Sequence, residues 1–331
     1  MASTSLKTPL SMLDLATVRE GKSVADALQT SVKTAQHAEC LGFNRYWLAE
    51  HHNMGGIASS ATAVLIGHIA GKTNTMRIGS GGIMLPNHAP LVVAEAFGTL
   101  AELYPDRIDL GLGRAPGTDQ ATMRALRRNR LNSAEDFPNE VSELQRLLAA
   151  PSAGQVITAT PGAGTNVPIW LLGSSLFSAQ LAGERGLPYS FASHFAPRML
   201  LEALQVYRRS FKPSAVLDKP YVMIGVPVIA ADTDDEAEYL ASSIYQRILG
   251  LLKGDLGKLP APVDNYLNSL HPQERHAIKD FLAAAVIGSP ETVANGLQEL
   301  IALTQADELM LVCDVYEPEL RFKSMSLTTQ V

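Results

Sequence analysis

The sequence predicts an α/β fold, specifically a (β/α)8 TIM barrel with insertions. Two observations carry this prediction: eight short apolar segments of strand length are spread over the 331 residues, and segments with helical periodicity lie between them. No internal period of about 20 to 50 residues indicates a solenoid. Because no linker divides the chain, residues 1–331 are expected to form one domain, with the polar residues 1–8 disordered.

In the first part of the chain, local signals mark where the elements begin and end. Ser23 and Asp26 are three residues apart and resemble a capping box, and the helix that they start ends at Gly42. Pro90 suits the first turn of a later helix. The expected elements are strands at 9–15, 43–49, 75–86 and 107–113, with helices at 23–41, 58–72 and 90–103.

The second part of the chain continues the alternation. Pro138 lies near the first turn of one expected helix, and Asp232 is the expected cap of another. Stretches rich in Gly and Pro place insertions at 150–167 and 253–285. The expected elements are strands at 168–173, 187–192, 221–230 and 308–313, with helices at 136–149, 174–183, 197–211, 232–252, 273–285 and 289–304.

The composition limits the class of protein. Hydrophobic residues make up 46% of the chain, which is enough for a large core. The net charge of −6 does not favour binding to nucleic acid or to an anionic membrane surface. The N-terminus lacks an apolar signal segment and no apolar run has the length of a membrane span. We therefore expect a cytoplasmic protein, with Cys40 and Cys313 as reduced core residues.

A cluster of titratable residues follows the second expected strand. Glu50, His51 and His52 come directly after the apolar segment 43–49, where parallel-sheet folds keep their chemistry. A metal site is not expected, because adjacent residues of an extended segment point in opposite directions and no His-x-x-x-His or Cys-x-x-Cys pattern occurs elsewhere. We expect one imidazole to act in catalysis and the other to hold the loop. A buried network that satisfies both imidazoles is the alternative.

A possible anion site follows the fifth expected strand. Gly173, Ser174, Ser175 and Ser178 place hydroxyls and free backbone N–H groups at a helix start, and Arg114 from the neighbouring strand could add a cation. The simpler alternative is that Ser174 or Ser175 only caps the helix. The barrel topology would bring further strand ends to the same rim. These are Gly81-Gly82 and Ser193-His194.

Glycines interrupt the third expected strand. Gly79, Gly81 and Gly82 mark a bulge or a close approach by a ligand, although a tight helix–strand contact is an alternative. The later glycines within 111–117 do not have the spacing of a dinucleotide fingerprint, which argues against a Rossmann fold. The sequence contains neither a nucleophile elbow nor an evident pair of strand-end carboxylates.

Several of these stretches, in this order, resemble the bacterial luciferase-like flavin monooxygenases, and more closely their single-chain subgroup, the luciferase-like monooxygenases. The matching stretches span nearly the whole chain, and together they are highly specific. They lie at 46–53, 79–88, 107–117, 170–175, 191–197 and 288–293.

The resemblance implies a barrel that binds reduced FMN at the carboxyl ends of its strands. Family members receive reduced flavin from a separate NAD(P)H-dependent flavin reductase, react it with O2 and insert one oxygen atom into a small organic substrate. They are commonly homodimers. The resemblance also implies a catalytic His51, a cis peptide in the Gly81-Gly82 region and phosphate contacts from Arg114, Ser175 and Ser178. From the residues themselves we expect Glu50 to hold His51 in place, Gly81 and Gly82 to adjoin the flavin, and Gly173 and Ser174 to complete the anion site.

The sequence departs from luciferase at Gly113, which stands where luciferase has a reactive cysteine beside the flavin. The luciferase partner subunit is also not expected, so neither light emission nor a long-chain aldehyde substrate is predicted. A deazaflavin-dependent oxidoreductase of the same fold and a flavin-binding protein without turnover are the alternatives. A lid is expected between the fifth and seventh strands or at 253–272.

Overall fold

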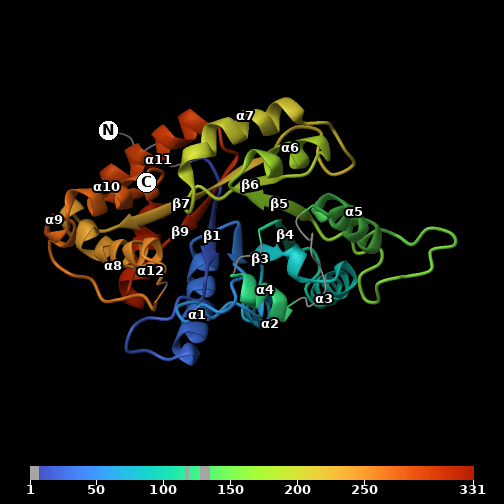
Figure 1. Ribbon diagram of the computed structural model, residues 1–331, viewed down its shortest axis with the longest axis horizontal. Coiled ribbons are helices and arrows are strands. Elements are labelled where there is room, and N and C mark those ends of the chain that lie inside the picture. Colours follow the sequence, from blue (N-terminus) through green and yellow to red (C-terminus); the bar gives the residue numbers. More distant parts are fainter. Residues whose placement is uncertain (1–6, 116–118, 127–134, 256) are drawn as a thin grey trace.

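The computed structural model describes residues 7–115, 119–126, 135–255 and 257–331 (Figure 1). Its strands pair in parallel in the order β6-β5-β4-β3-β2-β1-β9-β7, and a further pairing between β6 and β7 closes the barrel. Helices surround this sheet, which confirms the expected (β/α)8 barrel. The barrel strands are β1 (Leu10–Asp14), β2 (Arg45–Leu48), β3 (Arg77–Met84), β4 (Ile108–Gly113), β5 (Ile169–Gly173), β6 (Tyr189–Phe191), β7 (Val222–Ala230) and β9 (Glu308–Val312).

The helices cover the outside of the barrel, and the expected insertions appear beside it. The loop that follows α5 extends away from the barrel, whereas α9 and α10 lie next to α8 (Figure 1). Residues 1–6 of the expected disordered terminus lie outside the described residues. The helices are α1 (Val24–Cys40), α2 (Thr62–Ala70), α3 (Pro90–Leu103), α4 (Gln120–Leu126), α5 (Phe137–Leu148), α6 (Leu176–Glu184), α7 (Leu200–Ser210), α8 (Asp234–Leu252), α9 (Tyr266–Ser269), α10 (Pro272–Phe281), α11 (Pro290–Thr304) and α12 (Pro318–Thr329).

The start and end of α1 confirm the local sequence signals. The Ser23 hydroxyl accepts a hydrogen bond from the backbone N–H of Asp26 at 3.1 Å, and the Asp26 carboxylate accepts one from the backbone N–H of Ser23 at 3.0 Å. This is a capping box, which satisfies two N–H groups that the helix leaves free. After the helix, Gly42 adopts a left-handed conformation with φ of +78°.

The structure also contains elements that the sequence did not predict. The strand β8 (Val286–Gly288) pairs with the end of β7, so the sheet has nine strands in the described part of the chain rather than eight. Three residues are too few to show a strand periodicity. The helices α4 and α12 occupy stretches that carried no expected element, and α9 lies in an expected loop. For α12, Pro318 in the first turn was a usable signal.

Two further sequence assignments are wrong in detail. The cap of α8 is Thr233 rather than Asp232, because the Thr233 hydroxyl accepts from the backbone N–H of Glu236 at 3.1 Å. Cys40 is the last residue of α1 and is exposed, so it does not belong to the core, whereas Cys313 is buried. Both cysteines are free thiols. In the described part of the chain, no helix combines the length and apolar character needed to cross a membrane.

An apolar cluster fills the inside of the barrel. In it, Trp47 and Trp170 meet edge to face, with ring centroids 5.2 Å apart. Side chains alternate along each strand, so inward-facing residues are separated by outward-facing ones: on β7, Met223 points inward and Ile224 packs in the outer core under the helices. We call the inner group the interior cluster; it consists of Leu13, Trp47, Ala49, Trp170, Met223, Met310 and Val312.

Buried charges occupy the amino-terminal end of the barrel. Arg45, the first residue of β2, donates to Asp109 of β4 at 2.7 Å and to Glu308 of β9 at 2.8 Å. Both carboxylates are fully buried, and the guanidinium also lies over the ring of Trp170 at 4.7 Å. These pairs link strands from three sides of the barrel and fill this end, which leaves the carboxyl ends of the strands as the face for ligands.

Candidate active site

The loops after β2 and β3 lie side by side at the carboxyl rim of the barrel. β2 ends at Leu48 and is followed by Glu50, His51 and His52, whereas β3 is followed by His88. Because β2 and β3 are hydrogen-bonded neighbours, the topology brings residues together that are far apart in sequence.

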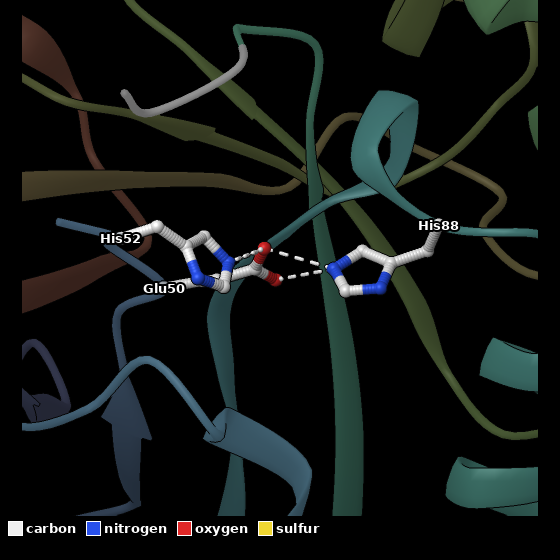
Figure 2. A group of neighbouring side chains, drawn as sticks. All are labelled: Glu50, His52 and His88. Atoms are coloured by element: carbon white, nitrogen blue, oxygen red, sulfur yellow. Dashed lines mark hydrogen bonds and ion pairs between the residues drawn. The ribbon is translucent and has the colours of Figure 1, made fainter. Parts of the chain in front are cut away.

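Glu50 is the centre of a hydrogen-bonded group at this rim (Figure 2). Its carboxylate is buried and accepts from Nε2 of His52 at 2.8 Å and from Nε2 of His88 at 2.8 and 3.0 Å. The backbone N–H of Met84 donates to the same carboxylate at 3.1 Å. We call Glu50, His52 and His88 the Glu50 cluster. It ties the loop after β2 to the end of β3.

The environment of Glu50 keeps its carboxylate charged. Burial acts to raise its pKa, but the hydrogen bonds and charge of His88, together with the bonds from His52 and Met84, prevail and hold the pKa below its ordinary value. An ionised carboxylate can only accept, so both Nε2 atoms carry the protons of these bonds. The ligand atoms of the Glu50 cluster lie within 4.8 Å of one another and could share a divalent cation, but both Nε2 protons would have to leave first.

His51 does not belong to the Glu50 cluster. Its charge instead acts on His194, which follows β6, and this interaction is one cause of the low pKa of His194. The two adjacent imidazoles therefore face different groups, as expected for neighbours on an extended segment. The sequence argument placed His194 on the rim but gave it no role, and it did not single out His88.

The glycines of β3 form a stretch of backbone without side chains. The peptide bond between Gly81 and Gly82 is cis, in the region expected for it, and the register to β4 shifts between Ser80 and Ile83. A Cβ on Gly81 would lie 2.7 Å from Leu13, and one on Gly82 would lie 2.7 Å from the backbone oxygen of Gly111. The close approach of the β4 backbone therefore requires glycine at position 82, whereas at position 81 the neighbouring atom is the end of the flexible Leu13 side chain.

Arg114 and the start of α6 come together beside this stretch. The guanidinium of Arg114 lies over the ring of Phe177, in the first turn of α6, at 4.3 Å. Ser175 is the N-cap residue, which is one of the two positions that the alternative named, but its side chain makes no capping hydrogen bond. A cation and helix N–H groups that the cap leaves without a side-chain partner thus lie at one place, an arrangement suited to a phosphate.

The remaining expected residues lie at the same turn. Ser178 is buried, and a Cβ on Gly173 would lie 2.4 Å from its hydroxyl oxygen, so glycine is needed for Ser178 to pack against the end of β5. Ser174 directly precedes the N-cap. Two residues of the family-like stretch after β4, Pro116 and Gly117, lie outside the described residues.

Comparison with known proteins gives matches over nearly the whole chain. Residues 8–307 match the family model described as luciferase-like monooxygenase. The chain is 52% identical to the uncharacterized protein YvbT of Bacillus subtilis (98% of this chain and 96% of YvbT) and 49% identical to a luciferase-like monooxygenase of Escherichia coli K12 (97% and 96%). Among solved structures it is similar to apo-MsnO8, with a TM-score of 0.87 and 34% identity over 98% of both chains.

Two more distant solved structures share the fold. The oxygenating constituent of 3,6-diketocamphane monooxygenase from Pseudomonas putida, in complex with FMN, is 18% identical with a TM-score of 0.75 and covers 98% of this chain and 97% of its own. An F420-dependent secondary alcohol dehydrogenase is 16% identical with a TM-score of 0.66 over 98% and 99%. At these identities the likeness concerns the fold alone.

Proposed function

The chain belongs to the luciferase-like monooxygenase family and is a flavin-dependent monooxygenase, and from this premise we propose that its flavin is reduced FMN. In this proposal the enzyme uses O2 to insert one oxygen atom into a small organic substrate. The reduced flavin comes from a separate NAD(P)H-dependent flavin reductase. The chain works as a cytoplasmic homodimer.

The observation that carries the choice of FMN is the position of Arg114 at the first turn of α6. A flavin with a phosphate tail suits a site that has a cation and helix N–H groups at one edge and a surface without side chains at another. Arg114, Ser174, Ser175 and Ser178 would hold the phosphate with the backbone of Gly173. Gly81 and Gly82 would leave room for the flavin ring.

The chain's own residues would manage protons and exclude water around the flavin. When bound, reduced FMN supplies the electrons that activate O2. His51 would hold or release a proton beside it, because an imidazole, with a reference pKa of about 6.5, changes charge near neutral pH. Glu50 remains ionised and is engaged by His52 and His88, so its proposed role is to fix the loop that carries His51.

Segments that could cover the site lie close to it. The loop after β6 contacts α10 through Phe195 and Phe281, whose ring centroids are 5.8 Å apart, and through Arg198 and Asp280 at 3.0 Å. This contact joins the stretch between the fifth and seventh strands, one of the two proposed lid segments, to the helix that follows the other, at 253–272. The proposed dimer has apolar side chains available on the adjacent helices α2 and α3: Val64, Val92 and Leu103.

Cofactor titration tests the proposed flavin. We expect the purified chain to bind reduced FMN and to consume O2 when a flavin reductase and NAD(P)H regenerate it. The second candidate is the deazaflavin F420, which a fold neighbour uses. Tight binding of F420 without binding of FMN would favour the deazaflavin-dependent oxidoreductase over the FMN-dependent monooxygenase. Binding of neither cofactor would refute both hypotheses.

Replacement of His51 tests the catalytic assignment. The variant His51→Ala should bind reduced FMN as the natural chain does, but should release more of the consumed O2 as hydrogen peroxide, because the proton group beside the flavin is missing. His276→Ala is the matched control, since that imidazole lies on α10 with 77% of its side chain exposed. Equal peroxide yields in all three proteins would contradict the role of His51.

A further inference from the structure

The proposed function assigns no role to one histidine at the carboxyl rim of the barrel. His194 follows β6 and is half-buried as a whole, but its Nδ1 atom is fully buried and has no hydrogen-bond partner among the described residues. Buried polar atoms in folded proteins nearly always have a partner. This nitrogen is sealed inside the protein, so a ligand at the carboxyl rim would meet the half-exposed remainder of the ring.

Gly225 shows where this nitrogen lies. Side chains alternate along β7, so a Cβ on Gly225 would point to the same side as Met223, which belongs to the interior cluster. That Cβ would lie 2.1 Å from Nδ1 of His194, and its three nearest atoms all belong to the His194 ring. The imidazole thus occupies the space that a side chain at position 225 would fill, inside the mouth of the barrel.

The backbone around His194 is anchored. The buried hydroxyl of Ser193 donates to the backbone oxygen of Gly225 at 2.6 Å, and the backbone N–H of Ser193 donates to the oxygen of Phe191 at 2.9 Å. These bonds fasten the residue before His194 to β6 and β7. The imidazole is therefore placed by the barrel itself rather than by a free loop.

The surroundings of His194 keep its ring uncharged. Burial is the main cause that lowers its pKa to about 4, the charge of His51 adds to the effect, and Asp314 opposes it. Asp314 is itself engaged by Arg247 at 3.3 Å and by Thr17 at 3.1 Å. Because Nδ1 is sealed, the neutral ring would meet a ligand through Nε2, which donates or accepts according to the tautomer.

We propose that His194 is a second imidazole of the active site and that it hydrogen-bonds the ring of the bound flavin. The inference rests on the proposed function. The flavin ring is the chosen partner because the His194 imidazole lies on the inner side of β7 and interacts with His51, the residue that the proposed function places beside the flavin. His51 and His194 would then approach the ring from β2 and β6, which stand on opposite sides of the barrel.

A double-mutant cycle on binding tests the geometry. His194→Ala should weaken binding of reduced FMN about tenfold, the effect of one buried hydrogen bond. Gly225→Ala should have the same effect, because the new Cβ displaces the imidazole. In the double variant the Gly225→Ala change should add nothing, since the ring that it would displace is gone. A further loss caused by Gly225→Ala in the His194→Ala background would overturn the proposed contact.

Reduced riboflavin separates a ring contact from a phosphate contact. It has the flavin ring but no phosphate, so His194→Ala should weaken binding of riboflavin and FMN by the same factor. Arg114→Met should weaken binding of FMN only, and His194→Asn should restore part of the lost affinity because an amide also donates and accepts. Circular dichroism would establish that each variant is folded.

The outcomes also separate this inference from the function on which it rests. If the natural chain binds no reduced FMN, the proposed function fails. If it binds reduced FMN and His194→Ala binds both flavins with unchanged affinity, only the role of His194 fails.

Discussion

At the level of single residues, the loop after β2 gives its two adjacent imidazoles different surroundings. His52 is held by the carboxylate of Glu50, whereas His51 acts on His194. The Glu50 carboxylate is the common anchor, because it also accepts from His88 and from the backbone of Met84. Loss of this anchor should therefore disturb both loops at once.

Glu50→Gln tests the anchor. The substituted amide keeps the shape of the Glu50 side chain but directs an N–H group toward the donors of its partners. We therefore expect the free energy of unfolding to fall by about 1–3 kcal/mol. Urea unfolding followed by circular dichroism measures the change. Glu202→Gln, an exposed position on α7, is the matched control and should stay within about 0.5 kcal/mol of the natural chain. Equal midpoints for the two variants would contradict the anchor.

The contribution of Glu50 should also depend on pH. Its pKa is lowered in the folded protein, so its stabilising effect is present above the pKa of the unfolded chain, about 4.3, and is lost as the pH falls through the lower folded value. The difference in unfolding free energy between the natural chain and Glu50→Gln should shrink as the pH falls below about 4. A difference that grows over this acid range has the wrong sign for this account.

At the level of elements, the helix ends show how much of a cap can be predicted from residues that are close in sequence. The capping box of α1 involves residues three apart and was predictable from them alone. At α6 the alternative named the N-cap position, Ser175, but its side chain makes no capping bond, and at α8 the sequence indicated Asp232 instead of the adjacent Thr233. Several polar residues in a row identify a helix start, but side-chain geometry decides which of them bonds to the backbone.

The cap of α8 can be tested by two neighbouring substitutions. Thr233→Ala removes the bond to the backbone N–H of Glu236 and should cost about 1 kcal/mol of stability. Asp232→Ala removes only an exposed ion pair with Lys323 and should cost less than that. Thermal unfolding of both variants measures the difference, and a larger loss for Asp232→Ala would reverse the assignment.

On the scale of the whole molecule, the sequence predicted the barrel better than the site. Strand and helix periods are local, so the closed sheet could be inferred, although the short β8 could not. The pair of Glu50 and His88 is 38 positions apart, and the match of His194 to Gly225 spans 31 positions. Such contacts depend on which strands become neighbours and on how closely the strands pack. A local sequence pattern predicts neither the neighbours nor the packing.

The buried charges at the amino-terminal end of the barrel should contribute to the stability of the whole fold. Arg45→Met leaves the buried carboxylate of Glu308 without a cation, whereas Asp109 keeps its ion pair with Arg77 at 2.6 Å, and we expect a loss of about 3 kcal/mol. Arg198→Met is the control: its pair with Asp280 is at the surface, with 81% of the Arg198 side chain exposed, so it should cost at most about 1 kcal/mol. Similar unfolding midpoints for both variants would contradict this.

The pairing of β1 with β9 has a consequence for synthesis on the ribosome. Ser11 on β1 donates to Glu308 on β9, a contact that spans 297 positions. During translation, β1 can pair with β2 as soon as that strand emerges, but its other edge stays without a partner until almost the entire polypeptide has been made. The nascent chain must therefore carry an open strand edge, a surface that other chains can join, through nearly the whole of its elongation.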